Sequence, residues 1–321
     1  MLGQLELAGA VAALTDLVTV APGALEAETA GETYQAQNPQ ELAHVLGGVL
    51  YQTLHTGRAK PLESAQRTWR DPAFDALLDE ATGARRTPLD VQAAPVAAGG
   101  VHALVDGLRV HVPDEHVLGR EDGTARIQLP SARPGLSPGF FYVTSGRGRG
   151  PGGGATLRLY ARLDTPDAAP GVWGALVAFL EDSGVPWRAK ISSSRVLYPR
   201  NDAVVVYLPR PGWRIARACA DLLQGTGLLG GGTSPFTQPI TESVGCAFEP
   251  DDQRPARREQ SFGQHRTQVF ADALIRHALL PDGEQEPVEQ VVAAAFIDAN
   301  IDPAVPARNL SSPVADVLRG Y

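Results

Sequence analysis

The chain has 321 residues, a hydrophobic fraction of 43%, a formal net charge of −8 and an isoelectric point near 5.4. This apolar content excludes wholesale disorder, and the acidic balance argues against a protein that binds nucleic acid by neutralising phosphates. No stretch approaches the roughly 18 uninterrupted apolar residues of a membrane span, and no targeting segment is visible, so the sequence predicts a cytoplasmic protein that binds neither membrane nor nucleic acid.

Residues 1–94 are predicted to form a helical N-terminal region. Apolar residues recur at helical spacing from Leu2 to Leu17, and the segment PQELAHVLGGVLYQTL at 39–54 has the same period. Pro39 suits a first helical turn and Gly57 a helix end. We assign His44 and His55, which lie on this second helix and at its end, to packing or surface roles.

From about residue 95 the apolar pattern changes to a period of two, which predicts strands. Because these strands are joined by turns before the first helix of the region, we expect residues 95–281 to form an α+β domain with a mixed, largely antiparallel sheet packed with helices. The predicted strands are 103–112, 125–129, 139–144, 156–163, the segment around Lys190, and 203–209; the predicted helices are 172–181 and 213–223.

A glycine-rich stretch at 146–154, GRGRGPGGG, contains a formal GxGxxG pattern. A strand follows it, whereas a nucleotide-binding fingerprint needs a helix N-terminus to hold the phosphate. We therefore interpret the stretch as a turn.

The last part of the chain is predicted to be helical. Residues 261–280 begin with Ser261 and Gln264, spaced as a capping box. Arg266 lies in the first turns, where the helix dipole disfavours a cation unless an anion or a carboxylate is close by, and the sequence does not decide between these partners. Residues 282–321 are expected to be a C-terminal helix and tail.

Lys190 is one of two lysines in the chain, in contrast to the many arginines. Arginine stays protonated, whereas a lysine amine can become neutral and accept a proton. Arg188, Lys190 and Ser192 alternate with Ala189 and Ile191, which places the two cations and the hydroxyl on one face of a strand.

The basic residues of several predicted elements, on one side of one sheet, would form a cationic pocket in an acidic protein. Guanidinium groups match the oxygens of phosphate, so phosphate is the expected ligand. Zinc-type cysteine spacing, HExxH and a nucleophile elbow are absent from the sequence, and no metal or other cofactor is predicted. The candidate phosphate-binding residues are Arg109, Arg158, Tyr160, Arg162, Arg200 and Arg266, with Arg188 beside Lys190.

A titratable amine and an imidazole in a phosphate pocket suggest one reaction. Neutral Lys190 would remove a Cα proton while His111 protonates the departing phosphate oxygen, which is β-elimination from a phosphorylated Ser or Thr. Neighbouring cations would lower the pKa of Lys190 toward the working pH.

Four segments carry a resemblance to a known family: LRLYARLD, VPWRAKISSSRVLYPRNDAVVVYLPR, SPFTQPIT and SFGQHRTQVFADAL. The chain resembles the HopA-type effector-like proteins, whose relatives serve as lyase components of class V lanthipeptide synthetases. The resemblance implies the fold and chemistry of effector phosphothreonine lyases. Arg109-Val110-His111 resembles their Lys-x-His strand motif with Arg in place of Lys, Lys190 resembles the base, and Arg200 and Arg266 resemble phosphate-binding arginines.

The resemblance also implies partners. A separate kinase, in complex with this chain, would phosphorylate a precursor peptide, this chain would produce dehydroalanine or dehydrobutyrine, and a cyclase would act afterwards. Two alternatives stay open on the sequence: a non-catalytic phosphopeptide-binding module, and an effector-like interaction protein that binds its partner through the helical N-terminal region.

Overall fold

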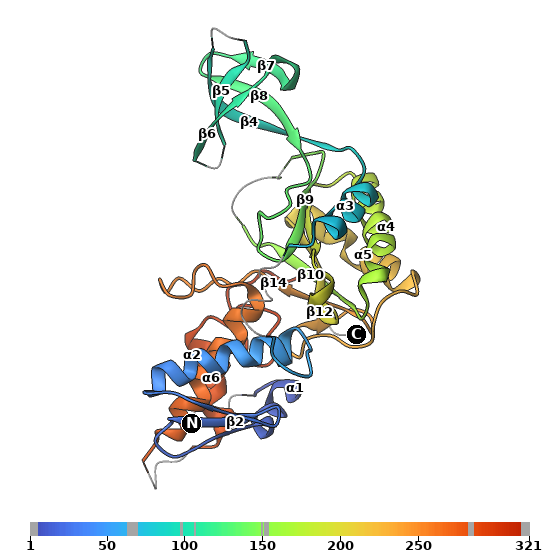
Figure 1. Ribbon diagram of the computed structural model, residues 1–321. Coiled ribbons are helices and arrows are strands. Elements are labelled where there is room, and N and C mark those ends of the chain that lie inside the picture. The colour runs from blue at the N-terminus through green and yellow to red at the C-terminus, as the bar shows by residue number, and fades with distance from the viewer. Residues whose placement is uncertain are drawn as a thin grey trace.

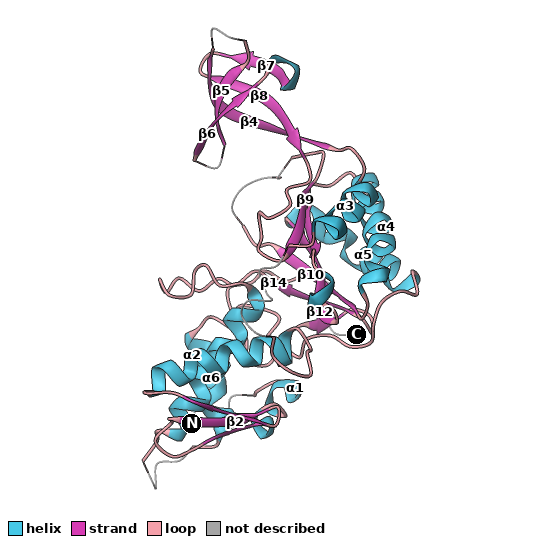
Figure 2. Cartoon of the chain, viewed as in Figure 1, coloured by secondary structure: helices cyan, strands magenta, loops and turns pink. Residues whose placement is uncertain are grey.

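The computed structural model describes residues 6–62, 70–96, 99–105, 107–148, 150, 154–281 and 286–315. It has a mixed α+β fold in which antiparallel sheets pack with helices, as the sequence predicts (Figures 1 and 2). No helix in these ranges is long and apolar enough to cross a membrane. Residues 1–5, Asp106, residues 151–153 of the glycine-rich stretch, residues 282–285 and the end of the tail from 316 lie outside them.

The N-terminal region has the expected helix from Pro39 but also strands that were not predicted, and the described part of the stretch from Leu2 to Leu17 forms only a four-residue helix and a 3-10 turn. Between the first short helix and α2, residues 18–35 form a three-stranded antiparallel sheet. Its second turn is Ala30-Gly31, and both residues have positive φ, 55° and 73°, as a tight hairpin requires. Ala in place of the usual Asn or Asp concealed this turn. The elements are α1 (Gly9–Ala12), a 3-10 turn (Thr15–Leu17), β1 (Val18–Val20), β2 (Glu26–Thr29), β3 (Glu32–Gln35), α2 (Pro39–Leu50), a π-helical turn (Tyr51–His55) and α3 (Pro72–Thr82).

A six-stranded antiparallel sheet forms the centre of the molecule, in the order β13-β14-β10-β12-β11-β9. Its strands are β9 (Phe140–Thr144), β10 (Leu157–Leu163), β11 (Arg188–Ser192), β12 (Arg200–Leu208), β13 (Gln238–Pro239) and β14 (Val244–Phe248). The apolar face packs on α5 (Ala216–Gly225), with α4 (Ala169–Asp182) beside it (Figure 1). Trp173 of α4 is fully buried and donates a hydrogen bond of 2.8 Å to Thr82, which links this layer to α3.

A second, five-stranded antiparallel sheet stands away from the central sheet (Figure 1). It consists of β4 (Arg86–Pro95), β5 (Val101–Val105), β6 (Leu108–Val112), β7 (Val117–Glu121) and β8 (Thr124–Pro130), in the order β6-β5-β4-β8-β7. Its buried residues, among them Ile127 and Ala103, form a small hydrophobic cluster of their own. The predicted strands at 103–112 and 125–129 therefore belong to a separate sheet.

At the other end of the molecule α2 packs along α6 (Phe262–Ala278), far from it in sequence (Figure 1). Gly47 leaves room for the side-chain amide of Gln268, since a Cβ there would lie 2.4 Å from it and would displace it. Ser261 and Gln264 form the predicted capping box of α6. The C-terminal segment continues with α7 (Val288–Asp298), and the remaining short 3-10 turns are 114–116, 166–168, 195–197 and 210–215.

Candidate functional site

The polar face of the central sheet brings several predicted residues together. Lys190 on β11 and Tyr160 on β10 pair with the same residue of β12, and in the next row Arg188 and Arg158 both pair with Tyr207. Directly paired residues of antiparallel strands project to the same face. The alternation read from the sequence therefore places these side chains on one side of one sheet.

Lys190 is held in a confined polar environment. Its Nζ lies 3.9 Å from the centre of the Phe140 ring and 3.3 Å from the Ser137 hydroxyl. Burial lowers the pKa of Lys190 to about 7, and the positive charges of Arg158 and Arg200 act in the same direction, against two nearby carboxylates. An amine with this pKa is substantially neutral near pH 7 and can accept a proton.

Arg200 is the cation nearest to this amine that also lines a cavity. Its Nε and Nη2 donate to Asp202 at 2.6 and 2.8 Å, and Nη2 lies 3.5 Å from the Tyr51 hydroxyl. Its guanidinium carbon lies 4.9 Å from the centre of the Phe140 ring, the ring that Lys190 also contacts. Although burial opposes it, the ion pair with Arg200 lowers the pKa of Asp202 to about 2. Arg200 and Asp202 therefore form a buried ion pair in which both side chains are charged.

Arg158 has a comparable partner. Its Nε and Nη2 donate to the carboxylate of Glu249, which follows the end of β14. The guanidinium groups of Arg158 and Arg188 both lie over the ring of Tyr207, at 4.9 and 5.3 Å from its centre. Three arginines and one lysine thus face two carboxylates, Glu249 and Asp202, and the site carries a net positive charge in an acidic protein.

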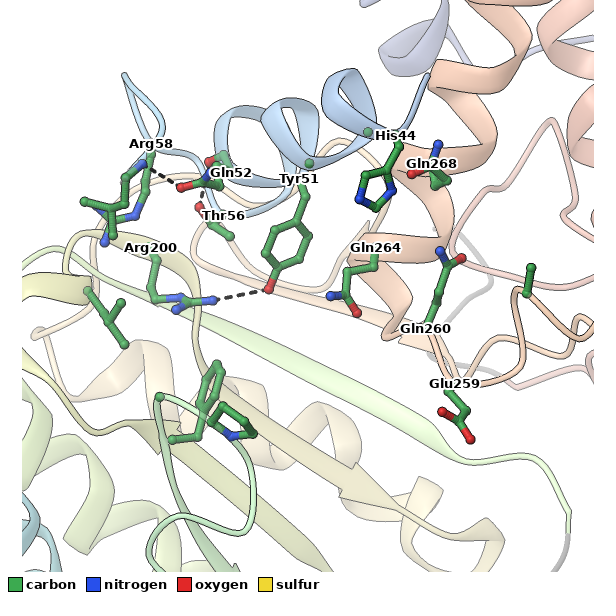
Figure 3. Close-up of a pocket in the computed structure, with 18 of the residues that line it drawn as sticks. His44, Tyr51, Gln52, Thr56, Arg58, Arg200, Glu259, Gln260, Gln264 and Gln268 are labelled. Carbon is green, nitrogen blue, oxygen red and sulfur yellow. Dashed lines mark hydrogen bonds between the residues drawn. The ribbon is translucent and has the colours of Figure 1, made fainter. Parts of the chain in front are cut away.

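A cavity of about 630 Å³ opens beside Arg200 (Figure 3). Its walls come from α2 and the π-helical turn, from residues 138–140, and from residues 255–268. Figure 3 shows the Tyr51 side chain extending from the helix toward Arg200, with Gln264 on the far side. Residues that line it include His44, Tyr51, Gln52, Arg58, Phe140, Arg200, Gln260, Gln264 and Gln268.

The structure does not bring Arg109 and His111 to this site. Both lie on β6, in the separate five-stranded sheet. His111 is exposed, and its Nε2 is 2.9 Å from the carbonyl oxygen of Gly99. The prediction of one pocket with Lys190 required their strand to belong to the central sheet. The strands between residues 86 and 130 instead pair with one another.

Arg266 is fully buried and serves another purpose. Its guanidinium donates to the carbonyl oxygens of Pro306 and Arg308, at 2.9 and 3.2 Å, and to the side chain of Asn309 at 2.9 Å. Burial lowers its pKa to about 9. Neither of the partners left open by the sequence is correct, because backbone carbonyls and an amide of the C-terminal segment surround this arginine.

The two other predicted contacts are also engaged. Arg162 donates to Asp164 at 2.7 Å and to Asn201 at 2.8 Å, with a side chain that is 20% exposed. Tyr160 is buried beneath Phe262, with ring centres 5.7 Å apart, and contributes packing more than an accessible hydroxyl.

Sequence reasoning missed five residues of the site: Tyr51, His55, Phe140, Asp202 and Glu249. Asp202 had a detectable signal, since it lies two residues after Arg200 on the same strand and so shares its face. Tyr51 and His55 had no such signal, because their place in the site depends on contacts with Arg200 and Asp202 of β12. Among the described residues no cluster of His, Cys, Asp and Glu could hold a metal ion.

Comparisons with known proteins agree with the sequence-based resemblance. Two solved structures are similar at low identity: the effector protein from Pseudomonas syringae pv. tomato strain DC3000 (13% identity, 84% of this chain and 89% of that one, TM-score 0.47) and the effector protein from Pseudomonas syringae pv. syringae strain 61 (15%, 84% and 93%, TM-score 0.46). No curated protein sequence gives a significant match. The model of the HopA1 effector protein family matches residues 131–308, more than half of the chain, and the protein therefore belongs to that family.

Proposed function

We propose that this protein is a phosphoserine/phosphothreonine lyase that eliminates phosphate from a phosphorylated peptide. The observation that carries the proposal is Lys190, a confined amine with a pKa lowered to about 7, which lies among arginines and against the ring of Phe140, a residue of the cavity wall. A lysine meant only to hold phosphate gains nothing from a lowered pKa, whereas a general base needs one near the working pH.

We expect Arg200 to bind the phosphate. Asp202 occupies its Nε and Nη2, and within the described part of the chain Nη1 makes no hydrogen bond that would exclude a ligand. A guanidinium has five N–H donors, so it can bind a carboxylate and a phosphate oxygen together. The Arg158–Glu249 pair, on the same face, would add positive potential without direct contact.

The reaction needs two proton transfers. Neutral Lys190 takes the Cα proton, the C–H electron pair forms the Cα=Cβ bond, and the Cβ–O pair leaves with the phosphate, which acquires a proton. His111 is exposed on another sheet, so this chain must supply that second proton from elsewhere.

The resemblance to lyase components of lanthipeptide synthetases supports a precursor peptide as the substrate. A separate kinase would phosphorylate its Ser or Thr residues, and the dehydroalanine or dehydrobutyrine product would pass to a cyclase. The cavity beside Arg200 is of the size of small-ligand pockets and has room for a phosphorylated side chain with its neighbouring peptide units.

A second candidate function is a phosphopeptide-binding module without catalysis. One observation favours it: two of the three site arginines, Arg158 and Arg200, already have carboxylate partners, so the site is stable without a ligand. In that case Lys190 would be another phosphate contact.

Mass spectrometry of a phosphothreonine peptide incubated with the protein alone separates the two. A lyase removes the elements of phosphoric acid and leaves dehydrobutyrine; a phosphatase removes only the phosphoryl group and leaves threonine; a binder returns the peptide unchanged. Lys190→Arg keeps the charge and removes the base, so elimination should stop while phosphopeptide binding persists. Lys60→Arg is the matched control, since the Lys60 side chain is 76% exposed and pairs with the surface residue Glu32.

A further inference from the structure

We infer that Tyr51 is the group that donates a proton to the departing phosphate oxygen. The inference rests on the proposed lyase function and fills the role that His111 cannot take. It depends on the position of Tyr51 between the cavity and the Arg200–Asp202 pair, and on the absence of His111 from that place.

The local backbone places Tyr51 where a reacting group could meet it. Residues 51–55 form a π-helical turn at the end of α2, a wide turn that is rare and often occurs at functional sites. The Tyr51 side chain lines the cavity, and its hydroxyl lies 3.5 Å from Nη2 of Arg200 and 3.4 Å from Oδ2 of Asp202 (Figure 3). A phosphate held by Arg200 would therefore be close to this hydroxyl.

Lys190 and the arginine beside Tyr51 contact the same ring from different strands. Arg200, which contacts Tyr51, and Lys190 both lie against Phe140, with 4.9 and 3.9 Å to the ring centre. A phosphorylated residue anchored on Arg200 could thus present its Cα hydrogen to the amine and its Cβ oxygen to the phenol.

The proton balance closes with these two groups. Lys190 gains the Cα proton, the phosphate leaves with the Cβ–O electron pair and takes the Tyr51 proton, and the resulting phenolate lies beside the guanidinium of Arg200. Water returns a proton to the phenolate after the product leaves, and Lys190 releases its own. Burial raises the pKa of Tyr51, so the donor is fully protonated at any working pH.

His55 has the geometry of a positioning residue. Its ring stacks on Tyr51 with centres 5.5 Å apart and an angle of 29°, and its Nδ1 is 3.0 Å from the Ser234 hydroxyl. Burial lowers the pKa of His55 to about 4, so it stays neutral and can brace Tyr51 without competing as a donor. The cavity lining does not include His55, which is 2% exposed.

The test compares two leaving groups. Phosphate needs a proton as it departs, whereas sulfate leaves as a weakly basic dianion that needs none. Turnover of a phosphoserine peptide and of its O-sulfoserine isostere is measured for the wild-type protein, Tyr51→Phe and Lys190→Ala. Tyr34→Phe is the matched control, since Tyr34 lies on β3, does not line the cavity, and donates its hydroxyl proton to Glu32.

Tyr51→Phe should lose about 10²–10⁴-fold in kcat on the phosphopeptide, the usual contribution of a general acid. Its Kd for the phosphopeptide should stay within a few-fold of wild type, and its turnover of the sulfopeptide should stay near wild type. Lys190→Ala should lose both activities, and Tyr34→Phe should keep both.

Each other outcome has a distinct meaning. Equal losses on both peptides, or a loss confined to Kd, would make Tyr51 a structural or binding residue and overturn the inference, while unaltered turnover of the phosphopeptide would remove it from the reaction. Both results leave the lyase proposal standing. A wild-type protein that eliminates neither peptide overturns the lyase function and this inference with it.

Discussion

The titration of Lys190 gives a quantitative prediction for the pH dependence of elimination. With a pKa of about 7, roughly a quarter of the amine is neutral at pH 6.5 and nearly all of it at pH 8.5, so kcat/KM should rise about fourfold and then become constant. A lysine with the ordinary pKa of 10.5 would instead give a rise of about 100-fold over the same range, with no plateau.

The sign follows from the role of the base. Only the neutral amine accepts the Cα proton, so activity must increase as pH rises through the pKa. The parameter to measure is kcat/KM, because it reports the free enzyme and not the complex, in which the phosphate dianion would raise the pKa of Lys190. The range starts at pH 6.5 because a phosphate ester has its own ionisation near pH 6.

The assay is absorbance or mass detection of the dehydroamino acid from a phosphothreonine peptide at constant ionic strength. Lys60→Arg should reproduce the wild-type profile, and Lys190→Arg should give no measurable profile at all. A rise that continues steeply to pH 8.5, or a profile that survives in Lys190→Arg, would refute Lys190 as the confined base.

Three further predictions concern the other residues. Arg200→Gln should weaken phosphopeptide binding by about 1.5–3 kcal/mol, measured by titration calorimetry, because a charge-assisted hydrogen bond is lost. Arg266→Gln should instead lower the melting temperature, because three acceptors of the C-terminal segment lose their donor. Equal effects of both substitutions on binding would contradict the structure. His111→Ala should leave elimination within about twofold of wild type, as expected for a surface change far from the site, and a large loss would restore it as the acid. Stability should fall as pH decreases from 6.5 toward 4, because burial lowers the pKa of His55 and of His265 to about 4 in the folded protein. Each histidine contributes up to roughly 3 kcal/mol of stability, which is fully present above pH 6.5. A melting temperature that stays constant over this range would contradict the prediction.

The sequence by itself determined the local structure around the site. Alternation of charged and apolar residues predicted the strands of Arg158 and Lys190 and the face on which each cation lies, because side chains of a strand project to opposite sides in turn. The capping box of α6 could also be predicted, because its two residues lie within one helical turn. The family could also be identified from the sequence, because its motifs are continuous segments.

Only the tertiary structure decided which elements meet. Alternation fixes the orientation of a side chain relative to its own strand but not the sheet that the strand joins. Hence His111 was placed with Lys190, although its strand pairs within a separate sheet. The carboxylate Glu249 and the phenol of Tyr51 come from elements distant in sequence, and their roles depend on the strand order β14-β10-β12-β11 and on the packing of α2 against α6. Arg266 shows the same limit, because its hydrogen-bond partners lie in a segment 40 to 43 residues later in the chain. Such long-range pairings form because a polar group that becomes buried needs a hydrogen-bond partner, and packing brings that partner from a distant segment, which no local sequence pattern encodes.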